Sequence, residues 1–174
     1  SPPTVPLPDA EATPMSSQEF TDTALALGRI PSGLFVMTTA FEGKRRGVRV
    51  TWVQQCGFDP PLVSVALAKG HCMAPLLQDS RSFALSQLAE EDRVSFRRFE
   101  DAAGASEDEF EDIETISLTT GAPALKRSVA ALDCLIVRHL DLDSDHELYV
   151  GQVVAGRVNG GSPAIRLRGD GMSY

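Results

Sequence analysis

The sequence predicts a mainly β domain, a closed antiparallel β-barrel with short helices at the connections between strands. Three observations lead to this prediction. About six apolar stretches have the length and side-chain types of strands. They do not alternate regularly with long helices, as the strands of parallel α/β folds do. No GxGxxG pattern follows a strand, which disfavours a Rossmann fold.

The chain opens with a proline-rich segment, residues 1–15, which we predict to be an extended arm. Its five prolines fix φ and remove backbone donors, so no helix or central strand is expected there. The arm is either disordered or crosses onto a second subunit. One domain, residues 16–174, follows. Its first helix is capped by Ser16 or Ser17 and ends at Gly28. The apolar face of this helix comprises Phe20, Ala24 and Leu27.

A hairpin and a buried strand are predicted next. Residues 32–41 form the first strand, residues 42–47 the turn and residues 48–53 the return strand. Residues 62–68 are nearly all apolar, which predicts a strand with both faces buried. The Asp59-Pro60-Pro61 sequence before that strand is typical of a rigid turn.

The middle of the chain combines short helices with one strand. Residues 73–80 predict a helix, residues 82–88 a strand and residues 90–99 a second helix. In this second helix the inward side chains are expected to be Val94 and either Phe96 or Phe99. Residues 100–114 are strongly acidic, which indicates a solvated surface excursion.

Long strands dominate the last third of the chain. A short helix is expected over residues 123–130, beginning at Pro123. Residues 131–142 and 147–158 predict two long strands joined by the turn sequence DSDH. Residues 162–174 add a last short strand and a tail.

Composition excludes several classes of protein. The net charge of −8 argues against a nucleic-acid binder, which needs clustered cations, and against binding to anionic membranes. No apolar run approaches the roughly 20 residues that span a bilayer. The odd count of three cysteines, without CxxC spacing, indicates reduced thiols and a cytoplasmic protein. The three histidines are scattered, so no metal site is expected.

A cationic hairpin raises the first question of ligand binding. Lys44, Arg45, Arg46 and Arg49 give an acidic chain a local positive charge. For the first three, a solvated hairpin tip is the favoured interpretation. Arg49 lies two residues before Thr51, on the same face of the predicted strand. In one interpretation, the side chains of Arg49 and Thr51 together bind one phosphate. In the other, Arg49 is simply part of the strand surface. The sequence leaves both interpretations open.

The only tryptophan of the chain, Trp52, lies beside two amides. An indole next to Gln54 and Gln55 offers a flat, partly polar wall of the kind that planar heteroaromatic ligands use. The alternative is that Trp52 fills the core, which is the commoner fate of a lone tryptophan. Buried amides need hydrogen-bond partners, so the two glutamines weaken that alternative.

Two further segments are candidates for ligand contact. Lys69-Gly70-His71 follows the buried strand and precedes a short helix, which suits a phosphate cradle. His146 ends the last predicted turn and would meet a ligand at the mouth of a barrel. The alternative interpretation is that His146 is simply an exposed histidine in a turn.

Four motifs, in order, resemble the flavin reductase-like family with its FMN-binding split-barrel fold. The first runs from Gly47 as VRVTWVQQCGF and continues as DPPLVSVALAK. The second is FALSQL, from Phe83, with a helix that closes at Phe99. The third is GAPALKRSVAALDC and the fourth is DHELYVGQV. The order holds over residues 20–174, and the tryptophan variant of the first motif resembles the flavoredoxin-type branch.

This resemblance implies a closed antiparallel split β-barrel of Greek-key type, and a homodimer with the flavin where the subunits meet. The implied activity is hydride transfer from NAD(P)H to the flavin, with FMN preferred over FAD and a possible electron-accepting partner protein. His146 would lie at the flavin face where nicotinamide docks, as the catalytic residue. The residues expected to bind the cofactor are Arg49, Val50, Thr51, Trp52, Gln54, Gln55, Cys56, Lys69, Gly70, His71, Ser86 and Phe99.

One departure and two alternative functions accompany the resemblance. Glu109 stands where many members have a lysine. Its carboxylate would repel a flavin phosphate, so we expect weaker binding unless Arg49 compensates. One alternative function is a non-catalytic FMN-binding electron carrier or module without a nicotinamide subsite. The other is a barrel that no longer binds flavin. Cys56 is expected to be a packed thiol.

Overall fold

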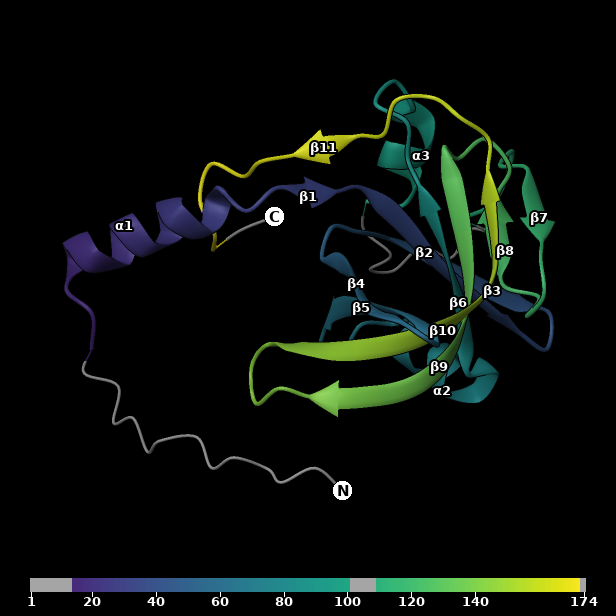
Figure 1. The fold of residues 1–174 in the computed structure, drawn as a ribbon, viewed down its shortest axis with the longest axis horizontal. Helices are drawn as coiled ribbons and strands as arrows, with labels where there is room; N and C mark the ends of the chain where they lie inside the picture. The colour runs from purple at the N-terminus through teal and green to yellow at the C-terminus, as the bar shows by residue number, and fades with distance from the viewer. Residues whose placement is uncertain (1–13, 101–108, 173–174) are drawn as a thin grey trace. The chain divides into compact units, whose positions relative to one another are not determined.

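A computed structural model describes residues 14–100 and 109–172 (Figure 1). The chain divides into two compact units, Ser32–Arg166 and the flanking segments Ser1–Pro31 with Leu167–Tyr174. The described elements are α1 (Ser17–Gly28), β1 (Ser32–Gly33), β2 (Phe35–Phe41), β3 (Lys44–Val50), β4 (Val53–Phe58), β5 (Pro61–Ala68), α2 (Ala74–Ser80), β6 (Ser82–Gln87), α3 (Arg93–Arg98), β7 (Thr115–Ser117), β8 (Pro123–Leu125), β9 (Ala130–Asp141), β10 (His146–Val158) and β11 (Ile165–Arg166). Most of the predicted arm and residues 101–108 of the acidic stretch lie outside the described residues.

The larger unit is built on one antiparallel sheet with the strand order β3-β2-β6-β9-β10-β5-β4. The pairings β2–β3, β2–β6, β6–β9, β9–β10, β5–β10 and β4–β5 are all antiparallel, which confirms the predicted mainly β class. The long strands β9 and β10 pair along most of their length, with two register shifts (Figure 1).

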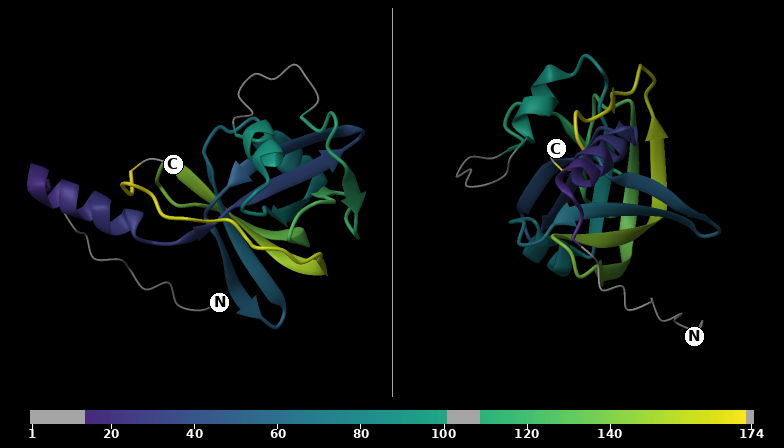
Figure 2. Two further views of the ribbon diagram at one scale, coloured as in Figure 1. Left: turned by 90° about the horizontal axis from the view of Figure 1, so that it is seen from above. Right: turned by 90° about the vertical axis from the view of Figure 1, so that its left-hand side faces the viewer.

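The two edge strands of this sheet, β3 and β4, are neighbours in the chain. Only Thr51 and Trp52 separate them, so Val50 and Val53 lie at most about 11 Å apart. A flat sheet would hold its edges much farther apart, at about 4.8 Å per strand. The sheet therefore curls back on itself at this end (Figure 2). The described strands contain no β3–β4 ladder, so closure of the barrel stays a prediction.

A single core cluster packs side chains from all seven strands and from α2. Its fully buried members include Met37 of β2, Phe83 of β6 and Tyr149 of β10, and Val53 of β4 packs against them. Contacts between side chains of edge and central strands in one cluster also require a curled sheet. A second cluster lies on the other face of β2 and joins Val36 to Phe99.

The hairpin differs from its prediction. Glu42 and Gly43 alone form the turn, and both have positive φ, 49° and 78°. Positive φ at both central positions is typical of a type I′ turn, which needs only two residues. The return strand therefore begins at Lys44 rather than Val48 and ends at Val50. The predicted strand 48–53 is thus the end of β3, a two-residue link and the start of β4.

Three smaller predictions are corrected. Residues 123–130 contain β8 instead of a helix, because Pro123, Ala124 and Leu125 are all buried and pair with β7. The helix 90–99 is shorter, since Asp92 caps it by accepting a hydrogen bond from the Ser95 backbone, and Val94 is exposed while Phe99 is buried. The strand 62–68 is fully buried on one face only.

The smaller unit contains α1, which begins and ends as predicted. Ser16 and Glu19 form a reciprocal capping box at its start. Of the predicted apolar face only Ala24 is buried, while Phe20 and Leu27 are exposed. The last residues of the chain return to this helix, where the Gly171 backbone donates to the Ala24 carbonyl. Among the described residues, every helix is too short or too polar to cross a lipid bilayer.

Candidate functional site at Trp52 and His146

The link between the two edge strands brings Trp52 against His146. Their ring centroids are 4.7 Å apart and the rings are tilted by 50°. The sheet explains this contact. The Trp52 carbonyl accepts a hydrogen bond from Ala66 of β5, and His146 pairs in register with Ala68 of the same strand. Two residues predicted to contact the ligand, 94 positions apart, are therefore neighbours.

His146 is held by the aspartate before it. Its Nδ1 lies 2.8 Å from the Asp145 carboxylate, and its side chain is only 13% exposed. Hydrogen bonds from His146 and, to a lesser degree, from Ser144 hold the pKa of Asp145 below its ordinary value. Asp145 is thus a carboxylate across the neutral range and fixes the orientation of the imidazole. Its role was not predicted, although the Asp-His sequence is a recognisable signal.

Thr51 carries a buried hydroxyl with an unmet hydrogen bond. Its Oγ1 is inaccessible and has no partner among the residues that the structure describes. An unsatisfied buried hydroxyl costs about 1–3 kcal/mol, so native proteins rarely keep one. Because the oxygen is also inaccessible, a polar group from outside the chain would reach it only after the atoms that cover it move.

Arg49 does not join Thr51 at a common phosphate position. Its guanidinium lies 4.0 Å from the centre of the Phe96 ring and donates to the Phe96 carbonyl of α3. It also forms a 3.3 Å ion pair with Glu100. The structure therefore directs this cation to α3, and a phosphate at Thr51 would have to attract it away from Glu100.

The strand β4 exposes its polar side chains along the edge of the sheet. Gln54 and Gln55 are exposed, and their amides make only long bonds within the strand, of 3.4 and 3.2 Å. Cys56 is exposed as well, which corrects the expectation of a packed thiol. The reason is a register shift between Gln55 and Gly57, which leaves Cys56 without a partner in β5.

The Lys69–Gly70–His71 turn lies beside His146. The Lys69 backbone donates to the Asp145 carbonyl, and its ammonium pairs with Asp141 at 2.6 Å. Gly70 has a φ of 74° and open space where a side chain would begin. The His71 ring accepts at Nδ1 a hydrogen bond from the Met73 backbone, which orients the ring. The predicted cradle is therefore close to His146, with its lysine already paired.

Three predicted cofactor residues lie in the core. Val50 and Phe99 are buried, and the Ser86 hydroxyl is fully buried and accepts from the Leu125 backbone at 2.9 Å. The structure does not bring Ser86 or Phe99 to the Trp52–His146 contact. Their part in cofactor binding stays a prediction.

Glu109 has a different role from the one we expected. It is 7% exposed and accepts hydrogen bonds from the Arg46 guanidinium at 3.1 Å and from the Gly47 backbone at 2.7 Å. Its charge is therefore compensated within the chain. It ties the end of the acidic stretch to β3, and Phe110 beside it is buried. Within the predicted surface excursion, Glu109 and Phe110 are therefore buried, whereas Glu111, Asp112 and Glu114 are exposed as expected.

The geometry defines a β domain whose sheet edge carries a flat indole, an oriented imidazole, exposed amides and an unpartnered hydroxyl. This combination suits a planar polar ligand. Comparison with known families gives its class: the flavin reductase like domain matches residues 27–169. The chain belongs to the flavin reductase-like family, which confirms the resemblance drawn from its motifs.

Individual relatives agree with this assignment. The chain is 32% identical over 139 residues to diflavin flavoprotein A 1 of Synechocystis sp., covering 79% of this chain and 24% of that protein. It thus spans about a quarter of the curated relatives it matches. Two solved structures superpose with a TM-score of 0.74 over 83% of this chain. They are the NADH:FAD oxidoreductase SgcE6 of Streptomyces globisporus C-1027 with NAD and FAD fragments (25% identity, 86% covered) and nitrilotriacetate monooxygenase component B of Mycobacterium thermoresistibile (26%, 80% covered).

Proposed function

We propose that this domain is an NAD(P)H-dependent flavin reductase with its flavin along residues 51–56. The observation that carries the proposal is the contact between Trp52 and His146, because it joins an aromatic wall to an oriented imidazole beside an exposed polar edge. The family and the relative that binds NAD and FAD fragments support the same activity.

The residues of this edge fit a flavin. Trp52 offers a flat face to the ring system, and the amides of Gln54 and Gln55 suit its polar rim. The unpartnered Thr51 hydroxyl would bind the polar chain of the cofactor once the atoms that cover it move. The Gly70 turn, with Lys69 and His71, would hold the phosphate once Lys69 exchanges Asp141 for it.

When bound, the flavin supplies the hydride-accepting chemistry. The protein then has only to bind, orient and shield the two reactants. Asp145 holds the His146 ring, which would position the nicotinamide at the exposed face of the site. Because the flavin supplies the reactivity, the site needs an oriented imidazole and no nucleophile of its own.

We propose FMN as the resident flavin, from the motif resemblance, and a split barrel closed between β3 and β4. FAD is the competing cofactor, because a solved relative contains FAD fragments. The dissociation constants of FMN and FAD, measured in parallel, distinguish the two candidate cofactors. FMN binding at least tenfold tighter supports the choice, and tighter FAD binding overturns it.

We propose further that two copies of the chain form a homodimer with the flavin near their interface. The support is the edge strand β4, whose last residue, Phe58, is 91% exposed next to the proposed site. The unpaired backbone of an edge strand is a surface to which another chain can add. Phe58→Ser should shift the mass measured by light scattering from dimer to monomer. A monomeric parent protein would contradict the proposal.

A second candidate function is a flavin-binding electron-transfer module within a longer protein. The match to about a quarter of the diflavin flavoproteins favours it. Adding FMN and NADH to the purified chain separates the two. Retained flavin with NADH consumption supports the reductase, and retained flavin without consumption supports the module. Failure to retain any flavin would contradict both.

The role of His146 has its own test. His146→Ala should lower the rate of NADH oxidation by at least tenfold and change FMN affinity much less, because the ring is proposed to position nicotinamide. The matched control is His71→Ala, which should weaken FMN binding more than it lowers the rate of NADH oxidation. Unchanged NADH kinetics in His146→Ala would remove the nicotinamide role.

A further inference from the structure

A pocket lies on the opposite face of β10 from His146. His146 and Tyr149 are three residues apart in a regular stretch of the β10–β5 ladder, so their side chains point to opposite faces. Tyr149 lines a cavity of about 410 Å³ between α2 and β9. None of the residues that line it belongs to the flavin site proposed above. They are Leu77, Gln78, Arg81, Ile136, Val137, Arg138, His139 and Tyr149.

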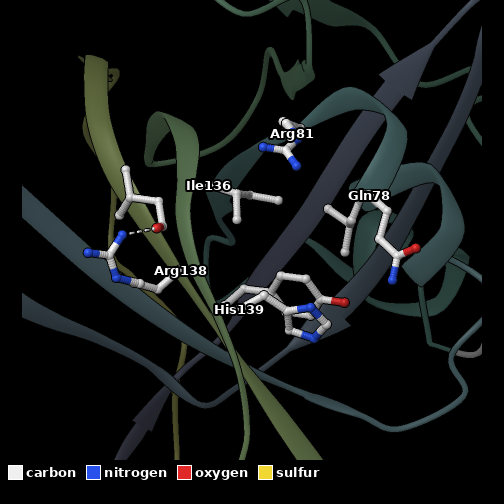
Figure 3. Close-up of a pocket in the computed structure, with 8 residues that line it drawn as sticks. Gln78, Arg81, Ile136, Arg138 and His139 are labelled. Carbon is white, nitrogen blue, oxygen red and sulfur yellow. Dashed lines mark hydrogen bonds between the residues drawn. The ribbon is translucent and has the colours of Figure 1, made fainter.

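The floor of this pocket is apolar and its rim is cationic. Leu77 and Tyr149 are almost fully buried, and Ile136 is half-buried. Arg81 and Gln78 extend from the α2 side and Arg138 from β9 around Ile136 (Figure 3). A volume of this size accommodates a small organic molecule.

The acidic groups near the rim are already paired. Glu147 lies 3.0 Å from His139 Nε2 and accepts a hydrogen bond from the Tyr149 hydroxyl at 3.1 Å. His139 in turn stacks on Tyr149, with ring centroids 4.3 Å apart and planes within 8°. Asp141 is paired with Lys69.

The two arginines of the rim have no such compensation. Within residues 14–100 and 109–172, neither Arg81 nor Arg138 forms an ion pair with a carboxylate, and the Arg138 guanidinium donates to the Val137 carbonyl. The pocket therefore favours an anion.

The backbone at Arg81 is left-handed, as it is at three other non-glycine residues of the described chain. Arg81 caps the C-terminus of α2 with φ 54° and ψ 26°. A left-handed residue at this position is usually glycine, because a Cβ disfavours the conformation. The backbone holds Arg81 there by hydrogen bonds to Leu77 and from Ile136. The chain thus keeps an arginine at the mouth of the cavity where glycine would be easier.

We propose that this pocket binds a small organic carboxylate, with its charged group at Arg81 and its apolar body on Leu77, Ile136 and Tyr149. Flat apolar bodies suit a floor formed partly by the stacked rings of His139 and Tyr149. The site is separate from the flavin site, so its occupation does not require that the proposed reductase activity is correct.

Isothermal titration of the full chain with benzoate tests the proposal. The matched variant is Arg81→Gly, which removes the guanidinium and relieves the left-handed backbone, so its melting temperature should stay equal or rise. We expect the dissociation constant for benzoate to rise at least tenfold in Arg81→Gly, and neutral benzamide to bind the parent protein at least tenfold more weakly than benzoate. Arg93→Ala, an exposed arginine on α3, is the control and should leave benzoate binding unchanged.

Three results would overturn the proposal. One is equal benzoate affinity in the parent protein and in Arg81→Gly. Another is the absence of binding up to about 10 mM benzoate, weaker than specific ligands bind. The third is displacement of benzoate by FMN, which would assign the carboxylate to the flavin site. Titration of Arg81→Gly with FMN distinguishes the two sites, since its flavin affinity should stay within about twofold of the parent value.

Discussion

At the scale of single residues, the position of Glu109 shows how burial changes the meaning of a charge. On sequence alone this carboxylate stands near a cofactor phosphate and would repel it. In the structure it is paired with Arg46 and bonded to the Gly47 backbone. A lysine at this position would place a second cation beside Arg46. The charge of Glu109 is instead compensated by Arg46 within this chain.

Replacing Glu109 by lysine should therefore destabilise the protein instead of improving flavin binding. We expect Glu109→Lys to lower the free energy of unfolding by about 3 kcal/mol, because it breaks a largely buried pair and adds an unpaired charge. Urea unfolding measures the effect. The control is Glu111→Lys, whose side chain is exposed and whose cost should be within about 0.5 kcal/mol. Tighter FMN binding in Glu109→Lys at full stability would contradict this account.

Burial also determines how the three cysteines differ in reactivity. Cys134 is fully buried in the core, and desolvation, with a smaller effect of Asp133, raises the pKa of its thiol to about 12. Cys56 and Cys72 are exposed. Because the thiolate is the reactive form, Cys134 stays inert at neutral and mildly alkaline pH.

A thiol reagent such as Ellman's reagent at pH 8 should therefore label Cys56 and Cys72 in the native protein, and Cys134 only after unfolding in urea. Absorbance of the released thiolate counts the groups. The Cys134→Ala variant should give the same count of thiols in the native protein. It should lack the additional thiol that unfolding exposes in the parent protein. Rapid labelling of all three cysteines under native conditions would be inconsistent with the buried position of Cys134.

At the scale of elements, packing sets which strand positions tolerate a side chain. Gly151 and Gly156 both lie in β10. A Cβ at Gly151 would be 2.5 Å from the Phe83 ring and 2.8 Å from the Cys134 Cβ, whereas a Cβ at Gly156 would be 3.5 Å from its nearest neighbour. Only the first position requires its neighbours to move.

Gly151→Ala should accordingly lower the free energy of unfolding by about 1–3 kcal/mol, because it overpacks the core between β6, β9 and β10. Gly156→Ala is the matched control on the same strand. Its effect should be close to zero, because the added methyl group makes an ordinary contact. Equal melting temperatures for the two variants would show that the core around Phe83 is looser than the structure indicates.

Elements with a strong periodic signal could be predicted from the sequence, and elements defined by tertiary pairing could not. The cap at Ser16 and the long runs of β9 and β10 carry their own local signals, so α1 and both strands are where they were expected. Residues 123–125 form a strand because β7 and Ser86 satisfy their backbone, which no local pattern reveals.

The same limit applies to the site. Trp52 and His146 could be chosen individually from their residue types and neighbours. Their mutual contact depends on β5 lying between β4 and β10. The pairing of Arg49 with α3 and of Lys69 with Asp141 also comes from the tertiary structure, since each carboxylate is remote in sequence.

At the scale of the whole molecule, one curled sheet carries the two chemically different surfaces to which we assign ligands. The link from β3 to β4 and the start of β10 form the edge where we place the flavin, and the opposite face of β10 opens toward α2. The domain matches a family of flavin reductases and about a quarter of each longer diflavin relative. A single folded unit of this kind can act alone, as in a flavin reductase, or as one domain of a longer protein.

The proposed flavin site depends above all on stacking of the flavin on Trp52. The FMN dissociation constant of Trp52→Ala, measured by quenching of flavin fluorescence, tests this stacking. Loss of an aromatic stacking partner should raise this constant by about tenfold or more. The control is Phe41→Ala, an exposed aromatic at the tip of the β2–β3 hairpin, which should leave the constant unchanged. An unchanged constant in a folded Trp52→Ala protein would contradict the account.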